Sequence, residues 1–368
     1  MPLGILYRPE LREYDFGPGH HFRGDRYDVF PPFLRKKVPE DDNYRFIAAP
    51  AATEEDLLLI CDKVYIDVTR EYFRAMHLGL TYPANFYEFQ SSDNLPIGTP
   101  GRIEEAARLV VGQAKKSCDL VQSGEYQKVV SIGGGLHHAR RRYGEGFCLY
   151  NDVAFCGLYL KQMYHLDRVL ILDTDAHAGN GTSEYFYEDS GVLFIDMHQD
   201  PRTLYPGTGF THQIGERAGK GYTINIPLPE NSGEKSYRLA FEAIVEPVVN
   251  EFKPQIIIRN GGSDPHFSDG LTSLGLTING FRMIGERTRH LAEVCGGRVI
   301  DLIASGYNRK ILPYAWLALV TGLVGIDCEI PEPELMPDET FPDRFYYQAE
   351  KMVEQLRSIL KDYWACFR

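Results

Sequence analysis

The sequence predicts an α/β protein in which helices cover both faces of one mainly parallel sheet. Short apolar runs rich in β-branched residues alternate with longer segments of helical periodicity along most of its 368 residues. The short runs are almost continuously apolar, as strands that are covered on both faces should be. Neither a repeat nor a low-complexity segment interrupts this alternation. We therefore expect one three-layer α/β/α domain that spans residues 1–368.

The expected strands are short, and several of them end just before Gly or Asp. They are Lys128–Ile132, Arg168–Leu172, Val192–Ile195, Thr223–Ile226, Gln255–Ile258 and Val299–Ile303.

Helical periodicity fills the segments between these strands. The expected helices are Pro100–Gln122, Asp152–His165, Gly233–Glu251, Asn279–Cys295 and Lys310–Gly325. In the first of them, Thr99 is expected as N-cap with Pro100 at the first helical position. The Pro- and Glu-rich stretch 331–342 is expected to be a connector that leads to a last amphipathic helix at 343–363, packed on the body. The longest apolar stretch, 311–326, is shorter than the ~20 residues of a membrane-spanning helix, so it indicates a buried helix.

Charge and cysteine content narrow the functional classes. The formal net charge of -12 argues against direct binding to nucleic acid, and it permits a cationic substrate such as a lysine-bearing peptide or a polyamine. The seven cysteines are scattered and form no CxxC pair, which favours reduced thiols in the cytoplasm. The first ten residues show no secretion signal pattern, and no membrane association is expected.

A metal site is predicted where the strand at 168–172 runs into Asp173, Asp175 and His177. Residues two apart in an extended chain face the same side, so these side chains can point together. Two carboxylates crowded beside an imidazole repel and desolvate each other unless a cation joins them. The pattern therefore favours a divalent metal over the helix N-cap or turn that a single Asp would indicate.

A catalytic zinc site needs three protein ligands and one open position. Asp175 and His177 supply two, and the third should follow another strand, because sites in open α/β sheets form at the carboxyl ends of strands. The segment after the strand at 255–258 offers Asp264, and the small residues before it let the backbone approach closely.

Two further strand ends carry residues suited to catalysis. His137 and His138 follow the Gly-rich end of the strand at 128–132, and imidazoles suit proton transfer near neutral pH. The spare carboxylate of Asp173 could orient one of them. Tyr307 follows the strand at 299–303 and can present its hydroxyl to a developing oxyanion. Alone, such a Tyr is more often a packed aromatic, and such a His pair is as often structural.

Several motifs together resemble the histone deacetylase family of the arginase–deacetylase fold, and within it prokaryotic histone deacetylase-like amidohydrolases. The motifs are GGGLHHA, GFCLYND, DTDAHAGNG, YPGTG, GGSDP and SGY, within a resemblance that runs from Tyr14 to about Pro331. The resemblance implies a sheet of about eight strands and zinc-dependent release of acetate from an acetylated lysine side chain. The alternative substrate is an acetylpolyamine or another small acetylated amine. The ligand set suits iron(II) as well as zinc.

The resemblance also implies a role for each matched residue. Asp175, His177 and Asp264 correspond to the zinc ligands. His138 corresponds to the general base and acid, His137 to a charged histidine paired with Asp173, and Tyr307 to the tyrosine that polarises the carbonyl. Gly146, Phe147 and Tyr205 correspond to the acyl-lysine tunnel, Asp93 to its rim, Leu271 to the gatekeeper position, and Arg26 to an internal acetate channel. Two structural potassium sites are implied near Asp173, Asp175, His177, Asp196 and Met197, and near Phe186, Asp189, Val192 and Tyr222.

The chain departs from the family pattern at several of these places. Ser305 and Asn308 flank Tyr307 where Gly and Thr are commoner, and Asn180 stands where some members have Asp. Leu271 lacks the carboxylate that would pair with the distant ammonium of a polyamine.

Two other functions are weighed against deacetylation. A ureohydrolase shares the fold but needs two metal ions, and Gly179 and Asn180 do not supply the additional bridging carboxylates. A non-catalytic acyl-lysine binder would have lost a ligand or the tyrosine, and neither is lost.

Overall fold

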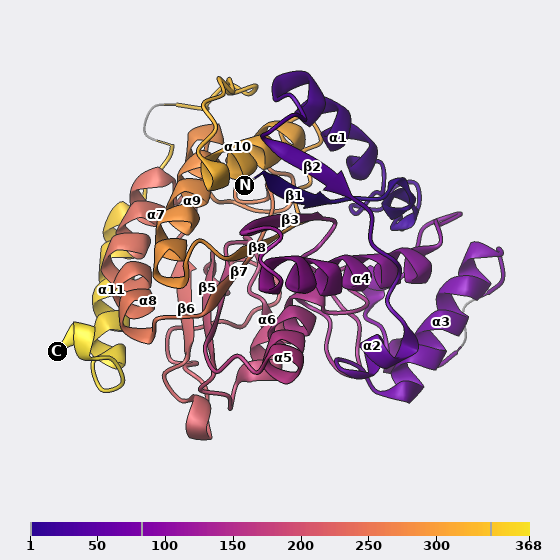
Figure 1. Ribbon diagram of the computed structural model, residues 1–368, viewed down its shortest axis with the longest axis horizontal. Coiled ribbons are helices and arrows are strands. Elements are labelled where there is room, and N and C mark those ends of the chain that lie inside the picture. Colours follow the sequence, from indigo (N-terminus) through magenta and orange to yellow (C-terminus); the bar gives the residue numbers. More distant parts are fainter. Residues whose placement is uncertain (1, 82–83, 339–340) are drawn as a thin grey trace. The chain divides into compact units, whose positions relative to one another are not determined.

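The computed structural model describes residues 2–81, 84–338 and 341–368 (Figure 1). Its strands are β1 (Leu3–Leu6), β2 (Tyr44–Ile47), β3 (Lys128–Ile132), β4 (Val169–Asp173), β5 (Val192–Gln199), β6 (Thr223–Leu228), β7 (Ile256–Asn260) and β8 (Val299–Ile303). They form one eight-stranded sheet in the order β2-β1-β3-β8-β7-β4-β5-β6. The strands β1, β4 and β5 pair in parallel with each of their neighbours. The predicted α/β fold with a parallel sheet is therefore confirmed.

The contacts of the chain define two compact units. The first contains the residues up to His165 together with Leu302–Ala304, and the second contains Leu166–Asp301 and Ser305–Arg368. Strand β8 contributes to both. The expectation of one domain over residues 1–368 stays a prediction.

The first unit combines β1, β2, β3 and the end of β8 with five helices. These are α1 (Arg26–Lys37), α2 (Glu54–Leu58), α3 (Lys63–His77), α4 (Ile103–Gln122) and α5 (Asp152–Tyr164). Helix α4 packs against β3 and α5. Its buried face is strongly apolar, and Val110, Val111 and Ala114 have no exposed surface.

The predicted start of α4 is wrong. The N-cap is Arg102, and the helix begins at Ile103 rather than at Pro100. The preceding chain docks on the N-terminal segment instead, because Gly101 donates to the Asp15 carbonyl (2.8 Å) and the Glu13 carboxylate accepts from the Arg102 amide (3.1 Å). A Thr-Pro pair cannot reveal this long-range contact.

The second unit combines β4 to β7 and the start of β8 with α6 (Asn180–Phe186), α7 (Glu234–Ala240), α8 (Glu246–Phe252), α9 (Ile278–Leu291), α10 (Leu312–Val324) and α11 (Tyr346–Leu360). One π-helical turn, Phe241–Val245, joins α7 to α8. Helices α9 and α10 lie side by side (Figure 1). Helix α10 is buried along nearly its whole length, and α11 packs on α7 and β6. The described residues of the segment 331–342 contain neither helix nor strand, and residues 339 and 340 lie outside the described part.

None of the described helices has the length and the apolar character that a membrane crossing requires.

Polar residues gather where the central strands end. In the register of the sheet, Asp173 of β4 pairs with Asp196 of β5 on one side and with Asn260 of β7 on the other. All three side chains are buried. The carboxyl ends of parallel strands lie at one edge of the sheet, and the loops that leave this edge carry the candidate site.

Candidate metal centre

The loop that follows β4 supplies two of the predicted ligands. Strand β4 ends at Asp173, so Asp175 and His177 lie beyond the strand, and the Oδ1 atom of Asp175 accepts from the His177 amide (2.8 Å). Asp173 is fully buried and has a different environment. Its Oδ1 atom accepts from the Asp175 amide (3.1 Å), and both of its carboxylate oxygens accept from the side-chain amide of Asn260 (3.0 and 2.9 Å).

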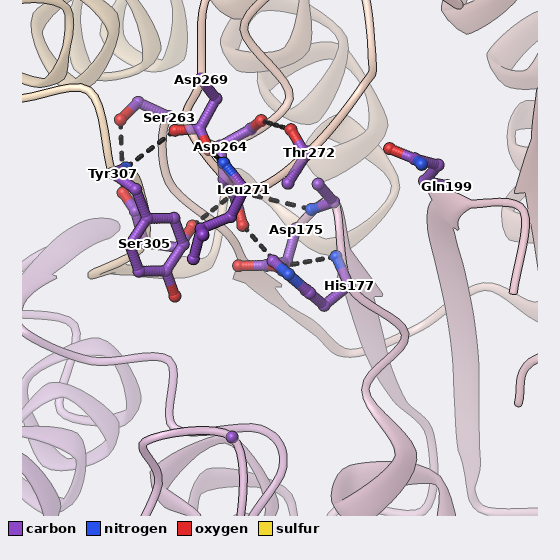
Figure 2. Close-up of polar contacts among 12 residues, drawn as sticks. Asp175, His177, Gln199, Ser263, Asp264, Asp269, Leu271, Thr272, Ser305 and Tyr307 are labelled. Atoms are coloured by element: carbon purple, nitrogen blue, oxygen red, sulfur yellow. Dashed lines mark hydrogen bonds and ion pairs between the residues drawn. The ribbon is translucent and has the colours of Figure 1, made fainter. Parts of the chain in front are cut away.

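The loop that follows β7 supplies the third predicted ligand, Asp264. Gly261 has a positive φ of 135°, and a Cβ atom there would lie 2.8 Å from Thr174 Oγ1 and 2.9 Å from the Asp175 amide nitrogen. Only glycine lets the two loops approach so closely. One ligand atom from each of Asp175, His177 and Asp264 lies within 4.8 Å of the other two. Figure 2 shows these three side chains pointing toward one another.

The electrostatics of this group favour a cation. All three side chains are buried, and the Nδ1 atom of His177 lies 3.1 Å from an oxygen of Asp175 and 3.1 Å from an oxygen of Asp264. Burial, together with the charge of Asp175, raises the pKa of Asp264 to about 7. Burial alone would lower the pKa of His177, but its bonds to the two carboxylates raise this pKa to about 10. A divalent ion would compensate both carboxylates and leave the imidazole neutral, so the residues fit the predicted metal.

The loop that follows β8 places Tyr307 beside this group. The rings of Tyr307 and His177 have centroids 6.3 Å apart and are nearly perpendicular, at 84°. The carboxylate of Asp269, a residue that the sequence did not single out, accepts from the amides of Tyr307 (2.8 Å) and Leu271 (2.9 Å). No local pattern signals this role, because Asp269 and Tyr307 are 38 residues apart in the chain.

The predicted catalytic histidines lie in the first unit. The rings of His137 and His138 have centroids 4.1 Å apart, and both side chains are buried. Asp152, which had no predicted role, holds their loop by accepting from the amides of Gly135 (2.9 Å) and Leu136 (2.7 Å). Burial raises the pKa of Asp152 to about 6. The sequence feature that points to this role of Asp152 is the Asn-Asp pair at the end of GFCLYND, where α5 begins.

Most of the predicted substrate residues also lie in the first unit. Gly146 is packed so closely on the ring of His138 that a Cβ atom would overlap it, and its amide donates to Asp93 Oδ2 (3.1 Å). Phe147 has a positive φ of 64°, and its ring packs against His20 with a centroid distance of 4.9 Å. Arg26 is buried and donates to the Ala304 carbonyl (2.9 Å).

The remaining predicted site residues lie in the second unit. Tyr205 is 41% exposed and precedes a cis peptide bond to Pro206, and Leu271 is half-buried. Asp196 pairs with Asp173 across the β4–β5 register, and its carboxylate lies 2.9 Å from Nδ1 of the buried His198. Burial raises the pKa of Asp196. The other residues predicted near potassium lie in β5 (Val192 and Met197), at the end of α6 (Phe186), just after it (Asp189) and just before β6 (Tyr222).

The structure thus brings together Asp175, His177 and Asp264, with Tyr307 close by. It brings together His137, His138 and Gly146 separately, in the first unit.

Comparisons with known proteins agree on one family. A sequence model described as the histone deacetylase domain matches residues 20–323. A probable deacetylase of Archaeoglobus fulgidus is 34% identical over an alignment of 377 positions, which covers 100% of both chains. The acetoin utilization protein AcuC of Staphylococcus xylosus is 34% identical and covers 93% of this chain and 86% of its own. That of Bacillus subtilis is 33% identical and covers 91% and 84%.

A solved structure agrees at the level of the fold. The crystal structure of the HDA15 HD domain superposes with a TM-score of 0.82 at 24% identity, covering 100% of this chain and 97% of that one.

Proposed function

This chain belongs to the histone deacetylase family and is a hydrolase of acetyl amides, and from that premise we propose that it is a zinc-dependent enzyme that removes acetyl groups from lysine side chains of proteins or peptides. The observation that carries the metal dependence is the buried group of Asp175, His177 and Asp264. Two carboxylates and one imidazole form the kind of three-ligand set that catalytic zinc sites use, and the same set also suits iron(II).

The metal would be held by these three side chains. When bound, a divalent cation would polarise the amide carbonyl and lower the pKa of a water molecule from about 15.7 toward 7.

Proton transfer is assigned to His138. Its ring lies against the ring of His137, and two imidazoles this close repel when both are charged, so one of them stays free to accept a proton. We assign the charge to His137, with Asp173 as its partner. His138 then takes one proton from the attacking water and gives it to the leaving nitrogen as the C–N bond breaks. The products are a neutral lysine amine and acetic acid, which exchange a proton in water to give the ammonium and acetate.

Tyr307 is assigned to the developing oxyanion. Its ring stands beside His177, and its main chain is held by Asp269. A hydroxyl donor that is already in place stabilises the charge that appears on the carbonyl oxygen without reorganisation. The first potassium site is proposed near Asp173, Asp175, His177, Asp196 and Met197, where a cation would compensate the buried carboxylates of Asp173 and Asp196 on adjacent strands together with His198. The second potassium site is proposed at Phe186, Asp189, Val192 and Tyr222, on the resemblance alone.

The substrate is proposed to enter past Asp93, Gly146, Phe147, Tyr205 and Leu271, with Arg26 serving an internal channel. A polyamine specialist would need a carboxylate facing the distant ammonium, and Leu271 supplies none, which favours acetyl-lysine.

All seven cysteines are free thiols, the form that a reducing cytoplasm maintains, and this supports a cytoplasmic location.

A substrate panel tests the proposal. The protein loaded with zinc or iron(II) is assayed on peptides that carry acetyl-lysine or longer acyl-lysines and on acetylpolyamines. We expect metal-dependent release of acetate, with kcat/KM highest for the acetyl-lysine peptide and no turnover by Asp264→Ala. Faster turnover of an acetylpolyamine would overturn the substrate assignment, and full activity in the metal-free protein would overturn the metal dependence.

A further inference from the structure

A serine hydroxyl contacts one of the proposed metal ligands. The Oγ atom of Ser305 donates to Oδ1 of Asp264 at 2.8 Å. The other oxygen of the same carboxylate, Oδ2, is the one that lies 3.1 Å from His177. Oδ1 also accepts from the Ala176 amide, at a longer 3.4 Å. The two oxygens of Asp264 therefore have different environments. Oδ1 is hydrogen-bonded by the surrounding protein, and Oδ2 faces the other proposed metal ligands.

The main chain holds Ser305 firmly in this position. Its carbonyl accepts from the Ser263 amide (2.9 Å) and from the indole nitrogen of Trp316 (3.1 Å), and Trp316 is fully buried in α10. Gly262 lies so close that a Cβ atom there would overlap both the carbonyl and the hydroxyl of Ser305. The loops after β7 and β8 thus interlock, and the hydroxyl approaches the carboxylate from a fixed backbone (Figure 2).

The main chain of Asp264 is anchored as well. Thr272 donates its hydroxyl to the Asp264 carbonyl. The bond from Ser305 to Oδ1 opposes rotation of the carboxylate relative to this main chain.

We infer that Ser305 is a positioning residue for the metal, which orients Asp264 so that Oδ2 faces the ion while Oδ1 is satisfied by the protein. The inference rests on the proposed metal site, and it concerns a position where the family more commonly has Gly. Groups that hold a metal ligand in place typically contribute about 10–100-fold in metal affinity. Ser305 acts on binding of the ion, not on the acetyl group.

The test measures metal affinity rather than turnover. Metal-free parent protein, Ser305→Ala and Ser305→Gly compete with a chromophoric chelator for Zn²⁺ at fixed pH. The two variants remove the same hydroxyl, and glycine is the residue expected to be commoner in the family at this position, so at least one folded variant is expected. Ser263→Ala is the matched control, because within the described part of the chain its hydroxyl contacts the Ser305 carbonyl, at 3.4 Å, and not the carboxylate of Asp264.

We expect a dissociation constant at least about tenfold weaker for both Ser305 variants and one close to the parent for Ser263→Ala. Parent-like or tighter binding by a Ser305 variant would overturn the inference. An equal loss in Ser263→Ala would overturn it too, since the effect would then come from general packing of the loops. A parent protein that binds no Zn²⁺ would instead refute the proposed metal site, together with everything that rests on it.

Discussion

Tyr307 can be tested by removing a single oxygen atom. Replacing it with phenylalanine keeps the ring that stands beside His177 and deletes only the proposed oxyanion donor. Loss of one such donor typically lowers kcat by about 10²–10³. We expect Tyr307→Phe to lose that much turnover of an acetyl-lysine peptide and to bind one metal ion per chain as the parent does. Near-normal turnover would show that the hydroxyl does not meet the developing charge.

Asp152 offers a prediction about pH. Its folded-state pKa is raised to about 6 by burial, above the usual value of about 3.9 for an unfolded chain. Between these two values the folded state binds more protons than the unfolded state, so this group makes the free energy of unfolding fall as pH rises from about 4 to about 6. The contribution is on the order of 3 kcal/mol.

The variant Asp152→Asn cannot titrate and should lack this dependence. Denaturant unfolding of parent and variant at pH 4, 5, 6 and 7 provides the measurement. The stability of the variant relative to the parent should improve as pH rises from about 4 to about 6 and then level off, although Asn accepts one fewer bond from the Gly135–Leu136 loop. A difference that stays constant across this range contradicts the raised pKa.

At the scale of elements, the long apolar strands were predictable and the short ones were not. The strands β3 to β8 each contain a run of buried apolar residues, because they are covered on both faces. The strands β1 and β2 have four residues each, and β1 contains a glycine while β2 contains an exposed arginine and is only partly buried, so neither gives a run of buried β-branched residues. Helix α1 contains Pro31 and Pro32, which indicate a helix boundary in a sequence although they lie inside the helix in the structure.

The proposed metal ligands could be predicted because each of them follows a recognisable strand. Asp175, His177 and Asp264 come directly after β4 and β7, and a parallel sheet places such ends together. The supporting contacts of Asp269 and Ser305 could not be predicted. They join loops about forty residues apart in the chain, and the strength of such contacts depends on tenths of an ångström that no spacing pattern encodes.

Asp269 joins two loops and thereby two proposed functions. Its carboxylate accepts from the amides of Tyr307 and Leu271, so it fixes the proposed oxyanion donor and the loop of Leu271 together. In Asp269→Asn, one oxygen becomes an NH₂ group that confronts a backbone N–H. Because a displacement of about 1 Å can cost about 10²-fold in rate, we expect kcat to fall by roughly that factor while zinc affinity remains unchanged.

Asp343→Asn is the matched control for this prediction. Asp343 likewise accepts backbone amides, those of Gly233, Lys235 and Ser236 (each 2.9 Å), but it does so at the start of α7. We expect a comparable loss of stability in both variants, and a loss of kcat only in Asp269→Asn. Equal kcat in the two variants would leave Asp269 with a purely structural role.

At the scale of the whole molecule, the net charge of the chain and the charge of the candidate metal centre differ in how strongly solvent and salt screen them. The net charge of -12 is spread over a hydrated surface, where salt screens it and where it attracts cationic substrates only weakly. The two carboxylates of the candidate centre are buried, where screening is small. Removal of a bound ion should therefore affect folding of the second unit much more than any change of surface charge.

We accordingly expect a chelator to lower the melting temperature of the zinc-loaded protein. An ion present at a thousandfold excess over its dissociation constant stabilises the folded state by about 4 kcal/mol, which corresponds to roughly 10 °C for a unit of this size. Differential scanning calorimetry with added chelator and then with added Zn²⁺ measures the shift and its reversal. Tyr307→Phe should keep the shift and Asp264→Ala should lose it. Titration should give one ion of Zn²⁺ per chain, because the described residues contain one three-ligand group; two adjacent ions would instead indicate the binuclear chemistry of a ureohydrolase.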